Sequence, residues 1–232
     1  MRGILFDLDG TLLDIDLRTF LARYFDALSG ALGRLANADA GLDGAMRAVD
    51  SATQAMMRPH PGQTNREVFN AEFERITSIR LDDHWDVFER FYAEEFPGLG
   101  EGYGPMSGAL RAVETALGLG LKVAVATNPI FPRAAVEHRI AWAGLEAVDF
   151  AAVTSYEWMY ACKPYGAYYR QTAEAIGLDP AECLMVGDDA ALDLPAADVG
   201  MRTYYVGDAE DTSADYTGDL ETLADLLPRM VG

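Results

Sequence analysis

Polar side chains follow two apolar segments of this chain at the points where predicted strands end. Asp7 and Asp9 come directly after the short apolar run at residues 2–6, and Thr127 and Asn128 follow the apolar run 121–126. Ligands of open parallel sheets bind beyond the carboxyl ends of the strands. We therefore expect these side chains to lie close together at one edge of a sheet.

Two further groups of polar residues occupy equivalent places later in the chain. Lys163 lies at the start of a predicted helix that follows a weaker strand, and Asp188 and Asp189 follow the strand predicted at 183–186, with Asp193 beyond them. Lys163 is one of two lysines among the 18 cationic residues. Because lysine is a compact point charge and arginine is not, the choice of lysine here favours a specific role.

These residue types suit phosphoryl chemistry with a divalent cation. Carboxylates bind hard cations, and Mg²⁺ is typically held by one or two of them together with phosphate oxygens of the substrate. A carboxylate can also attack phosphorus and form an acyl-phosphate. A threonine hydroxyl can hold phosphoryl oxygens, and a lysine ammonium can offset the charge that spreads over the transferring group.

Each group also has a simpler explanation. Asp-Gly is a common turn pair, Thr127 could cap the following helix, and Lys163 could be a solvated residue before a proline. The acidic residues at 188–193 could stabilise a helix N-terminus. All four groups at strand ends are better explained by a shared site, and a helix N-terminus can also bind anions.

The elements around these groups divide the chain into two patterns. From Asp16 to about Pro97 the apolar residues recur at helical spacing, which predicts four helices and a small bundle. Asp16 is a predicted N-cap, and Thr64 with Glu67 matches a capping box. The glycines between 98 and 104 indicate a linker, which with Asp14 is a candidate hinge.

After the linker, helices and strands alternate. Helices are expected over 110–117, 132–143, 164–177 and 220–227, and strands over 121–126, 150–154, 183–186 and 202–206. Alternation of this kind predicts an α/β fold with a doubly wound parallel sheet and helices on both faces. The first strand must join this sheet, so residues 1–15 and 105–232 form the predicted core and residues 16–104 a helical insertion.

The order of these groups resembles the haloacid dehalogenase superfamily over the whole chain. Asp7-Leu8-Asp9-Gly10-Thr11 is similar to its first motif, Thr127 after an apolar strand to its second, Lys163-Pro164 to its third, and Gly187-Asp188-Asp189 with Asp193 to its fourth. The resemblance implies a Rossmann-like catalytic core and, for the insertion, a C1-type helical cap that selects the substrate.

The resemblance also implies a role for each residue. Asp7 would be the nucleophile, and Asp9 would protonate the leaving group and then activate water. Mg²⁺ would be held by Asp7, by the carbonyl oxygen of Asp9 and by Asp188 or Asp189, of which we favour Asp188. The fourth motif often reads Gly-Asp-Ser, so its second aspartate leaves this choice open.

The remaining residues would bind the phosphoryl group or support the site. Thr127, Asn128 and Lys163 would hold phosphoryl oxygens, and Asp193 would orient the lysine or a water on the metal. The implied function is Mg²⁺-dependent hydrolysis of a small phosphorylated metabolite through an aspartyl-phosphate. A phosphomutase and a non-catalytic binding protein are the alternatives; dehalogenase chemistry is disfavoured because a halide leaving group needs no acid such as Asp9.

Composition limits the partners. The net charge is −19 and the pI is about 4.3, so the molecule repels nucleic acid and anionic lipid, and any phosphate site needs local positive charge. No apolar run is long enough to span a membrane, and aspartates interrupt the first apolar run, unlike in a signal peptide. We therefore expect a cytoplasmic monomer or homodimer with reduced thiols at Cys162 and Cys183.

Overall fold

A six-stranded parallel sheet forms the centre of the protein in a computed structural model, which describes residues 1–35, 41–207 and 213–231. Its strand order is β5-β4-β1-β6-β7-β8, and every neighbouring pair is parallel. The strands are β1 (Gly3–Phe6), β4 (Lys122–Val125), β5 (Ala152–Val153), β6 (Cys183–Gly187), β7 (Arg202–Val206) and β8 (Tyr216–Gly218). The first strand lies in the middle of the sheet, which confirms the predicted α/β fold.

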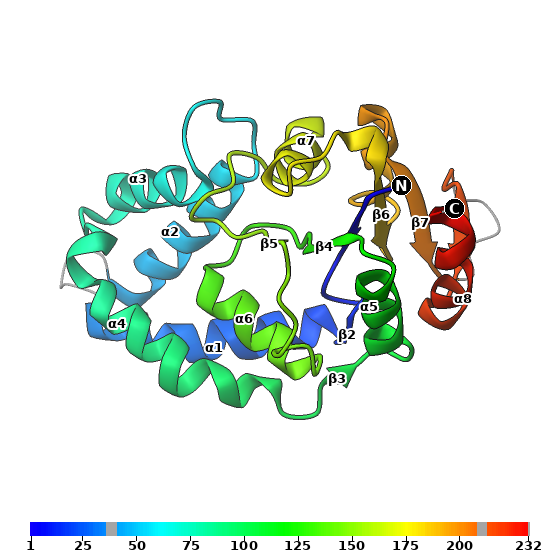
Figure 1. Ribbon diagram of the computed structural model, residues 1–232. Coiled ribbons are helices and arrows are strands. Elements are labelled where there is room, and N and C mark those ends of the chain that lie inside the picture. Colours follow the sequence, from blue (N-terminus) through cyan, green and yellow to red (C-terminus); the bar gives the residue numbers. More distant parts are fainter. Residues whose placement is uncertain (36–40, 208–212, 232) are drawn as a thin grey trace.

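Helices cover both faces of this sheet (Figure 1). They are α5 (Ala109–Gly118), α6 (Arg133–Trp142), α7 (Gly166–Ala175) and α8 (Leu220–Val231). Ile4 and Phe6 of β1 belong to the same apolar cluster as α5, α6 and α8, whereas Leu5 packs with α7 on the other face. This division follows from the two-residue period of a strand, and it explains why β1 is apolar at every position.

Four helices between β1 and the second half of the sheet lie at one side of the molecule (Figure 1). They are α1 (Leu17–Leu35), α2 (Gly41–Met56), α3 (Asn65–Thr77) and α4 (Trp85–Arg90). Asp16 caps the Thr19 amide at 2.6 Å, and the capping box of Thr64 and Glu67 is present, as predicted. Their core is continuous with the α5–α6–α8 face of the sheet, because Phe20 and Tyr24 of α1 pack against Phe131.

The fourth helix is shorter than the aromatic pattern suggests. After α4 the chain forms one π turn at Phe91–Glu95 and a 3₁₀ helix at Phe96–Gly100. These changes of winding aim Phe91, Tyr92 and Phe96 inward, where all three are buried. The predicted linker is therefore partly helical, and helical spacing alone does not reveal where the winding changes.

The two chain segments that join the helical insertion to the sheet lie side by side. Strand β2 (Leu13–Asp14) pairs antiparallel with β3 (Gly104–Pro105), so that Asp14 lies opposite Gly104. This two-stranded ribbon was absent from the sequence-based expectations, because two-residue strands carry no recognisable alternation. It coincides with the expected boundaries at residues 15 and 105, which remain a prediction.

Other differences concern the ends of elements. Helix α7 begins at Gly166 rather than Pro164, since the chain first turns so that the Tyr165 amide donates to the Cys162 carbonyl at 3.1 Å. Helix α8 continues past Pro228, and β8 was not anticipated. No helix among the described residues is long and apolar enough to cross a membrane.

Candidate active site

A pocket of about 170 Å³ lies at the carboxyl ends of β1, β4 and β6. All of the residues singled out from the sequence line it, namely Asp7, Asp9, Thr127, Asn128, Lys163, Asp188, Asp189 and Asp193. They come from four separate loops, so the parallel sheet brings together residues that the sequence separates by up to 186 positions. Gly10, Ile15, Leu17 and Leu192 complete its walls.

Asp7, Lys163 and Asp193 form a connected ion cluster. The Lys163 Nζ donates to Asp7 Oδ1 and to Asp193 Oδ1, each at 2.6 Å, and the lysine is almost completely buried. Burial alone would lower the pKa of the ammonium, but Asp193 and Asp7 together raise it well above its usual value. Lys163 therefore carries a full positive charge inside an acidic protein.

Burial has the opposite consequence for Asp7. Desolvation raises the pKa of this carboxyl well above its usual value, and although Lys163 opposes the shift, the charges of Asp193 and Asp9 add to it. Two carboxyl groups thus share one ammonium in this cluster. A bound cation would change the local electrostatics, because its own charge becomes the largest in the site.

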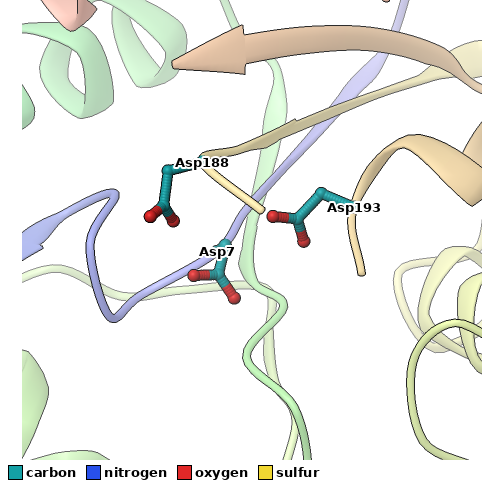
Figure 2. A group of neighbouring side chains, drawn as sticks. All are labelled: Asp7, Asp188 and Asp193. Carbon is teal, nitrogen blue, oxygen red and sulfur yellow. The ribbon is translucent and has the colours of Figure 1, made fainter. Parts of the chain in front are cut away.

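Three carboxylates are close enough to share a metal ion. One oxygen each of Asp7, Asp188 and Asp193 lies within 4.8 Å of the others, and Figure 2 shows Asp7 from the loop after β1 beside Asp188 and Asp193 from the loop after β6. Asp189 is exposed, and its Oδ1 instead accepts from the amides of Ala191 and Leu192 at 2.8 and 3.1 Å. The geometry therefore favours Asp188 over Asp189 as the ligand.

Two glycines and one threonine allow this close approach. A Cβ on Gly10, whose φ is +83°, would lie 2.3 Å from Asp188 Oδ2, and one on Gly187 would lie 2.0 Å from Asp193 Oδ2. Only glycine fits at either position. Thr11 Oγ1 donates to Asp188 Oδ1 at 2.9 Å, so the last residue of the first motif orients the carboxylate of the fourth.

Asp9 has a partner that the sequence reading did not include. Its Oδ2 forms an ion pair with Nη1 of Arg139 on α6, which is fully buried. Desolvation raises the pKa of Asp9 above its usual value, and the Arg139 guanidinium only partly opposes this shift. A raised carboxyl pKa is what a residue needs to donate a proton near neutral pH.

Thr127 and Asn128 lie where β4 ends, opposite the acidic residues. The Thr127 carbonyl accepts from the hydroxyls of Thr154 and Tyr168 at 2.7 and 2.9 Å, which fixes the loop. Asn128 Oδ1 accepts from the Lys163 amide at 3.2 Å and so joins the second and third motifs. Among the described residues the Thr127 hydroxyl has no protein partner within hydrogen-bond distance, so it is free to bind an oxygen in the pocket.

A second, apolar cavity of about 90 Å³ lies between the helical insertion and the loop after β4. Leu21 of α1 and Ile130 line it, whereas Leu17 and Asn128 line the polar pocket. The two spaces are thus neighbours, one helical turn apart along α1 and two residues apart along the loop. The cavity is otherwise lined mostly by aromatic and aliphatic side chains of α1 to α4.

Arg139 and Thr11 are the contributors that sequence reasoning missed. Thr11 lies inside the first motif, but nothing in its spacing indicates a contact across to Asp188. Arg139 follows Ala135 and Val136 and precedes Ile140 on the buried face of α6. An arginine in an apolar helical stripe was therefore the available signal, because such a residue must have a partner inside the protein.

Comparison with known proteins assigns this site to a family. The sequence profile of the haloacid dehalogenase-like hydrolases matches residues 1–199. The chain belongs to this family. The haloacid dehalogenase-like match contains all four motifs at the pocket, and it agrees with the resemblance noted from the sequence.

Solved haloacid dehalogenase-like structures have the same fold over their whole length. A phosphatase from Thermococcus onnurineus is 21% identical with a TM-score of 0.60, each chain covering 98% of the other. CbbY from Rhodobacter sphaeroides, in complex with phosphate, is 19% identical with a TM-score of 0.58 and coverages of 97% and 96%. The L-2-haloacid dehalogenase from Xanthobacter autotrophicus is 17% identical, with a TM-score of 0.56 and 99% coverage of both chains.

These identities show the shared fold and leave the reaction to be argued from the residues, since the neighbours include both phosphatases and dehalogenases. No curated protein matches the sequence. Membership of the family gives this chain a hydrolase scaffold, and the pocket described above lies at its centre.

Proposed function

We propose that this protein is a Mg²⁺-dependent phosphatase that hydrolyses a small phosphorylated metabolite through an aspartyl-phosphate on Asp7. The observation that carries the proposal is the cluster in which Lys163 bonds Asp7 beside Asp188 and Thr127. A positive charge next to a carboxylate nucleophile suits an anionic phosphoryl group. A halide leaving group would require no proton from Asp9.

Asp7 is the proposed nucleophile, and Asp9 the proposed acid and base. In the first step Asp7 attacks phosphorus in line and Asp9 gives its proton to the departing oxygen. In the second step Asp9 takes a proton from the water that attacks the aspartyl-phosphate. Removal of Asp7 should abolish turnover, whereas Asp9→Asn should slow it by about 10²–10⁴-fold, the usual contribution of general acid–base catalysis.

The acidic cluster fits magnesium. Asp7, Asp188 and the Asp9 carbonyl are the proposed ligands, with Asp193 orienting Lys163, and their oxygens suit a hard cation. When bound, Mg²⁺ supplies charge neutralisation between the attacking carboxylate and the phosphoryl oxygens. The pKa of Asp7, raised in the metal-free protein, supports the need for such a counter-charge.

Thr127, Asn128 and Lys163 are proposed to hold the phosphoryl oxygens. The free Thr127 hydroxyl and the charged Lys163 ammonium face the same pocket. Lys163, together with a bound Mg²⁺, would offset at this point the repulsion that a net charge of −19 exerts on an anionic substrate. The same overall charge supports the expectation that neither nucleic acid nor membrane is a partner.

The helical insertion, residues 16–104, is proposed to act as a C1-type cap. Its paired connections at β2 and β3 provide two adjacent crossings about which a cap can move. The apolar cavity beneath it favours a substrate whose non-phosphate part is small and apolar near the ester oxygen, since such cavities exclude water and accept apolar groups. A polyhydroxylated sugar would leave its hydroxyls unpaired there.

A phosphate-release assay over a panel of alkyl, aryl and sugar phosphates, with and without Mg²⁺, tests the proposal. Wild type and Asp7→Asn are compared in parallel. We expect Mg²⁺-dependent release that the variant loses, with alkyl or aryl phosphates preferred. Activation by a bisphosphorylated sugar would instead indicate a mutase, and release that survives Asp7→Asn would contradict the scheme.

A further inference from the structure

Helix α6 carries an arginine in the interior of the protein. Arg139 has no exposed surface, and its neighbours on the same helical face are Val136 and Ile140, both buried. Arginine is almost never fully buried without a partner, because its charge loses the solvation that water provides. The buried guanidinium of Arg139 must therefore have partners inside the protein.

Three contacts hold the guanidinium. Nη1 donates to Asp9 Oδ2, and Nε donates to the Ala135 carbonyl one turn earlier at 3.3 Å. The central carbon also lies 4.5 Å from the centre of the Phe131 ring, a cation–π contact. The arginine is thus fixed by its own helix and by the loop after β4, and it reaches across to Asp9 as its carboxylate partner among the described residues.

This contact divides the two oxygens of Asp9. Oδ2 is engaged by Arg139, whereas Oδ1 has no hydrogen-bond partner among the described residues. Asp9 lines the polar pocket beside Asp7. A carboxylate held through one oxygen in this way keeps a single orientation, and its other oxygen, which is buried and unpartnered, can exchange a proton with a group that enters the pocket.

We propose that Arg139 is a positioning residue for the acid–base work of Asp9: it fixes Oδ2 so that Oδ1 exchanges the proton with the leaving group and with water. The inference rests on the proposed phosphatase function. The four family motifs line the pocket, and none of them lies on α6. Arg139 therefore contributes to the site from a helix outside these motifs.

The proposed steps balance in atoms and charge. In the first step the bond between Asp7 and phosphorus forms, the bond between phosphorus and the ester oxygen breaks, and the Oδ1 proton moves to that oxygen. Asp9 is then ionised beside the guanidinium. In the second step water forms a bond to phosphorus, the Asp7–phosphorus bond breaks, and one water proton returns to Oδ1.

A purely structural ion pair is the alternative explanation. Buried ion pairs contribute little to stability compared with apolar side chains of the same size, since desolvation offsets their attraction. An arginine at this position is therefore poorly explained by packing against Val136 and Ile140. The distinction can be measured, because a positioning role depends on the leaving group and a structural role does not.

The test compares Arg139→Met with wild type on two substrates, 4-nitrophenyl phosphate and n-butyl phosphate. A nitrophenolate leaves without a proton, but a butoxide needs one. We expect Arg139→Met to lower kcat/KM, which reports the first step, by about 10–100-fold for butyl phosphate, a part of the usual acid–base contribution. The change in kcat/KM for nitrophenyl phosphate should be much smaller, whereas kcat can fall for both substrates because both pass through the same aspartyl-phosphate. Arg139→Lys should restore part of the loss.

Two controls accompany this comparison. Arg133→Met removes an exposed arginine from the same helix and should leave both rates unchanged. The double variant Asp9→Asn/Arg139→Met should be no slower than Asp9→Asn alone, because residues that act as one unit are not additive. This double variant also lacks the unpaired Asp9 charge, so it remains informative if Arg139→Met by itself does not fold.

Equal losses of kcat/KM on both substrates, or a double variant much slower than Asp9→Asn, would overturn the inference while leaving the phosphatase function intact. Wild type that releases phosphate from neither these substrates nor the panel would overturn the proposed function and the inference together. The pattern of rates in wild type therefore separates the two failures.

Discussion

Asp188 and Asp189 are neighbours with different surroundings, and the difference is testable. Asp188 accepts from Thr11 and faces Asp7, whereas Asp189 caps the turn that follows it and is exposed. A metal ion that binds only the folded state stabilises it in proportion to the logarithm of its concentration. The residue that holds the metal should therefore decide whether Mg²⁺ raises the melting temperature.

We expect Asp188→Asn to abolish the stabilisation by Mg²⁺ and Asp189→Asn to retain it. At a hundredfold excess over Kd the wild type should gain about 2.7 kcal/mol, which is roughly 5–10 °C in a chain of this size. Thermal unfolding with and without MgCl₂ measures both variants. If Mg²⁺ failed to raise the melting temperature of Asp189→Asn but still raised that of Asp188→Asn, Asp189 and not Asp188 would be the ligand.

The pH dependence of stability follows from the same carboxyls. Burial raises the pKa of Asp7, Asp9 and Asp188 above their usual values in the metal-free protein. A group whose pKa is higher in the folded state stabilises the fold below its unfolded pKa, and this stabilisation is lost as the pH rises through the folded value. The contribution of these three carboxyls to the stability of the metal-free protein should therefore fall as the pH rises above about 4.

Urea unfolding in chelator at about pH 5 and about pH 7.5 measures this loss. We expect Asp188→Asn to lose less stability than wild type between the two values, because one of the three raised groups is gone. Asp189→Asn is the matched control, since it removes the same charge from the exposed neighbouring position. Identical losses in both variants would mean that overall acidity, and not the buried cluster, sets the pH dependence.

At the scale of elements, the start of α3 is bonded to the loops of the sheet domain. The amides of Asn65 and Arg66 donate to the Met159 and Tyr156 carbonyls, both at 2.8 Å. The Asn65 side chain, which is fully buried, donates to the Pro129 carbonyl at 2.9 Å. Movement of the helical insertion about β2 and β3 would have to break these bonds, so they act as a clasp between the two parts.

Asn65→Ala should weaken this clasp. Loss of the buried hydrogen bonds from Asn65 Nδ2 to the Pro129 carbonyl and to Cys162 Sγ, with the carbonyl left unpaired, should cost about 1–3 kcal/mol of unfolding free energy. Hydrogen exchange should quicken at the amides of Asn65 and Arg66 more than in the central strands. Gln54→Ala, an exposed polar residue of α2, is the control; equal exchange in both variants would argue against a clasp.

The apolar cavity makes a second prediction for an element of the insertion. Val49 of α2 lines it, so Val49→Phe should fill part of the space that we assign to the leaving group. We expect KM for n-butyl phosphate to rise about 10-fold, a typical penalty for losing a methylene-sized contact, with little change for methyl phosphate. Leu42→Phe, on an exposed position of α2, is the control, and parallel changes for both substrates would remove the cavity from the substrate site.

Much of the element order could be predicted because it is written in local patterns. Buried strands such as β1, the capping box at Thr64 and the polar residues after each strand are all features of neighbouring residues. The β2–β3 ribbon and β8 depend on pairing between distant segments and have no local signature. The turns of π and 3₁₀ winding after α4 arise from packing of aromatic residues, which propensity does not encode.

The residues of the candidate site also differ in whether a local sequence pattern reveals them. Asp7, Thr127, Lys163 and Asp188 were predictable, because a parallel sheet gathers the residues at the carboxyl ends of its strands. Arg139 was not, because its partner is 130 positions away and it approaches from a helix. A charged residue on an apolar helical face is a signal that a sequence can offer, but only the fold names its partner.

For the whole molecule, we expect the phosphoryl group to pass through Asp7. Fold similarity to phosphatases and to a dehalogenase leaves this claim to chemistry. The other acidic residues, the buried Lys163 and the proposed acid–base residue Asp9 all lie near Asp7 at one edge of the sheet. Chemical trapping of that carboxylate therefore tests the account as a whole.

The most direct measurement is reduction with borohydride during turnover of the best panel substrate, followed by mass spectrometry of the peptide that contains Asp7. An acyl-phosphate is reduced to an alcohol, so we predict a mass change at Asp7 that requires both substrate and Mg²⁺ and that is absent when either is left out. Turnover without any change at Asp7, or a change at another aspartate, would contradict the account.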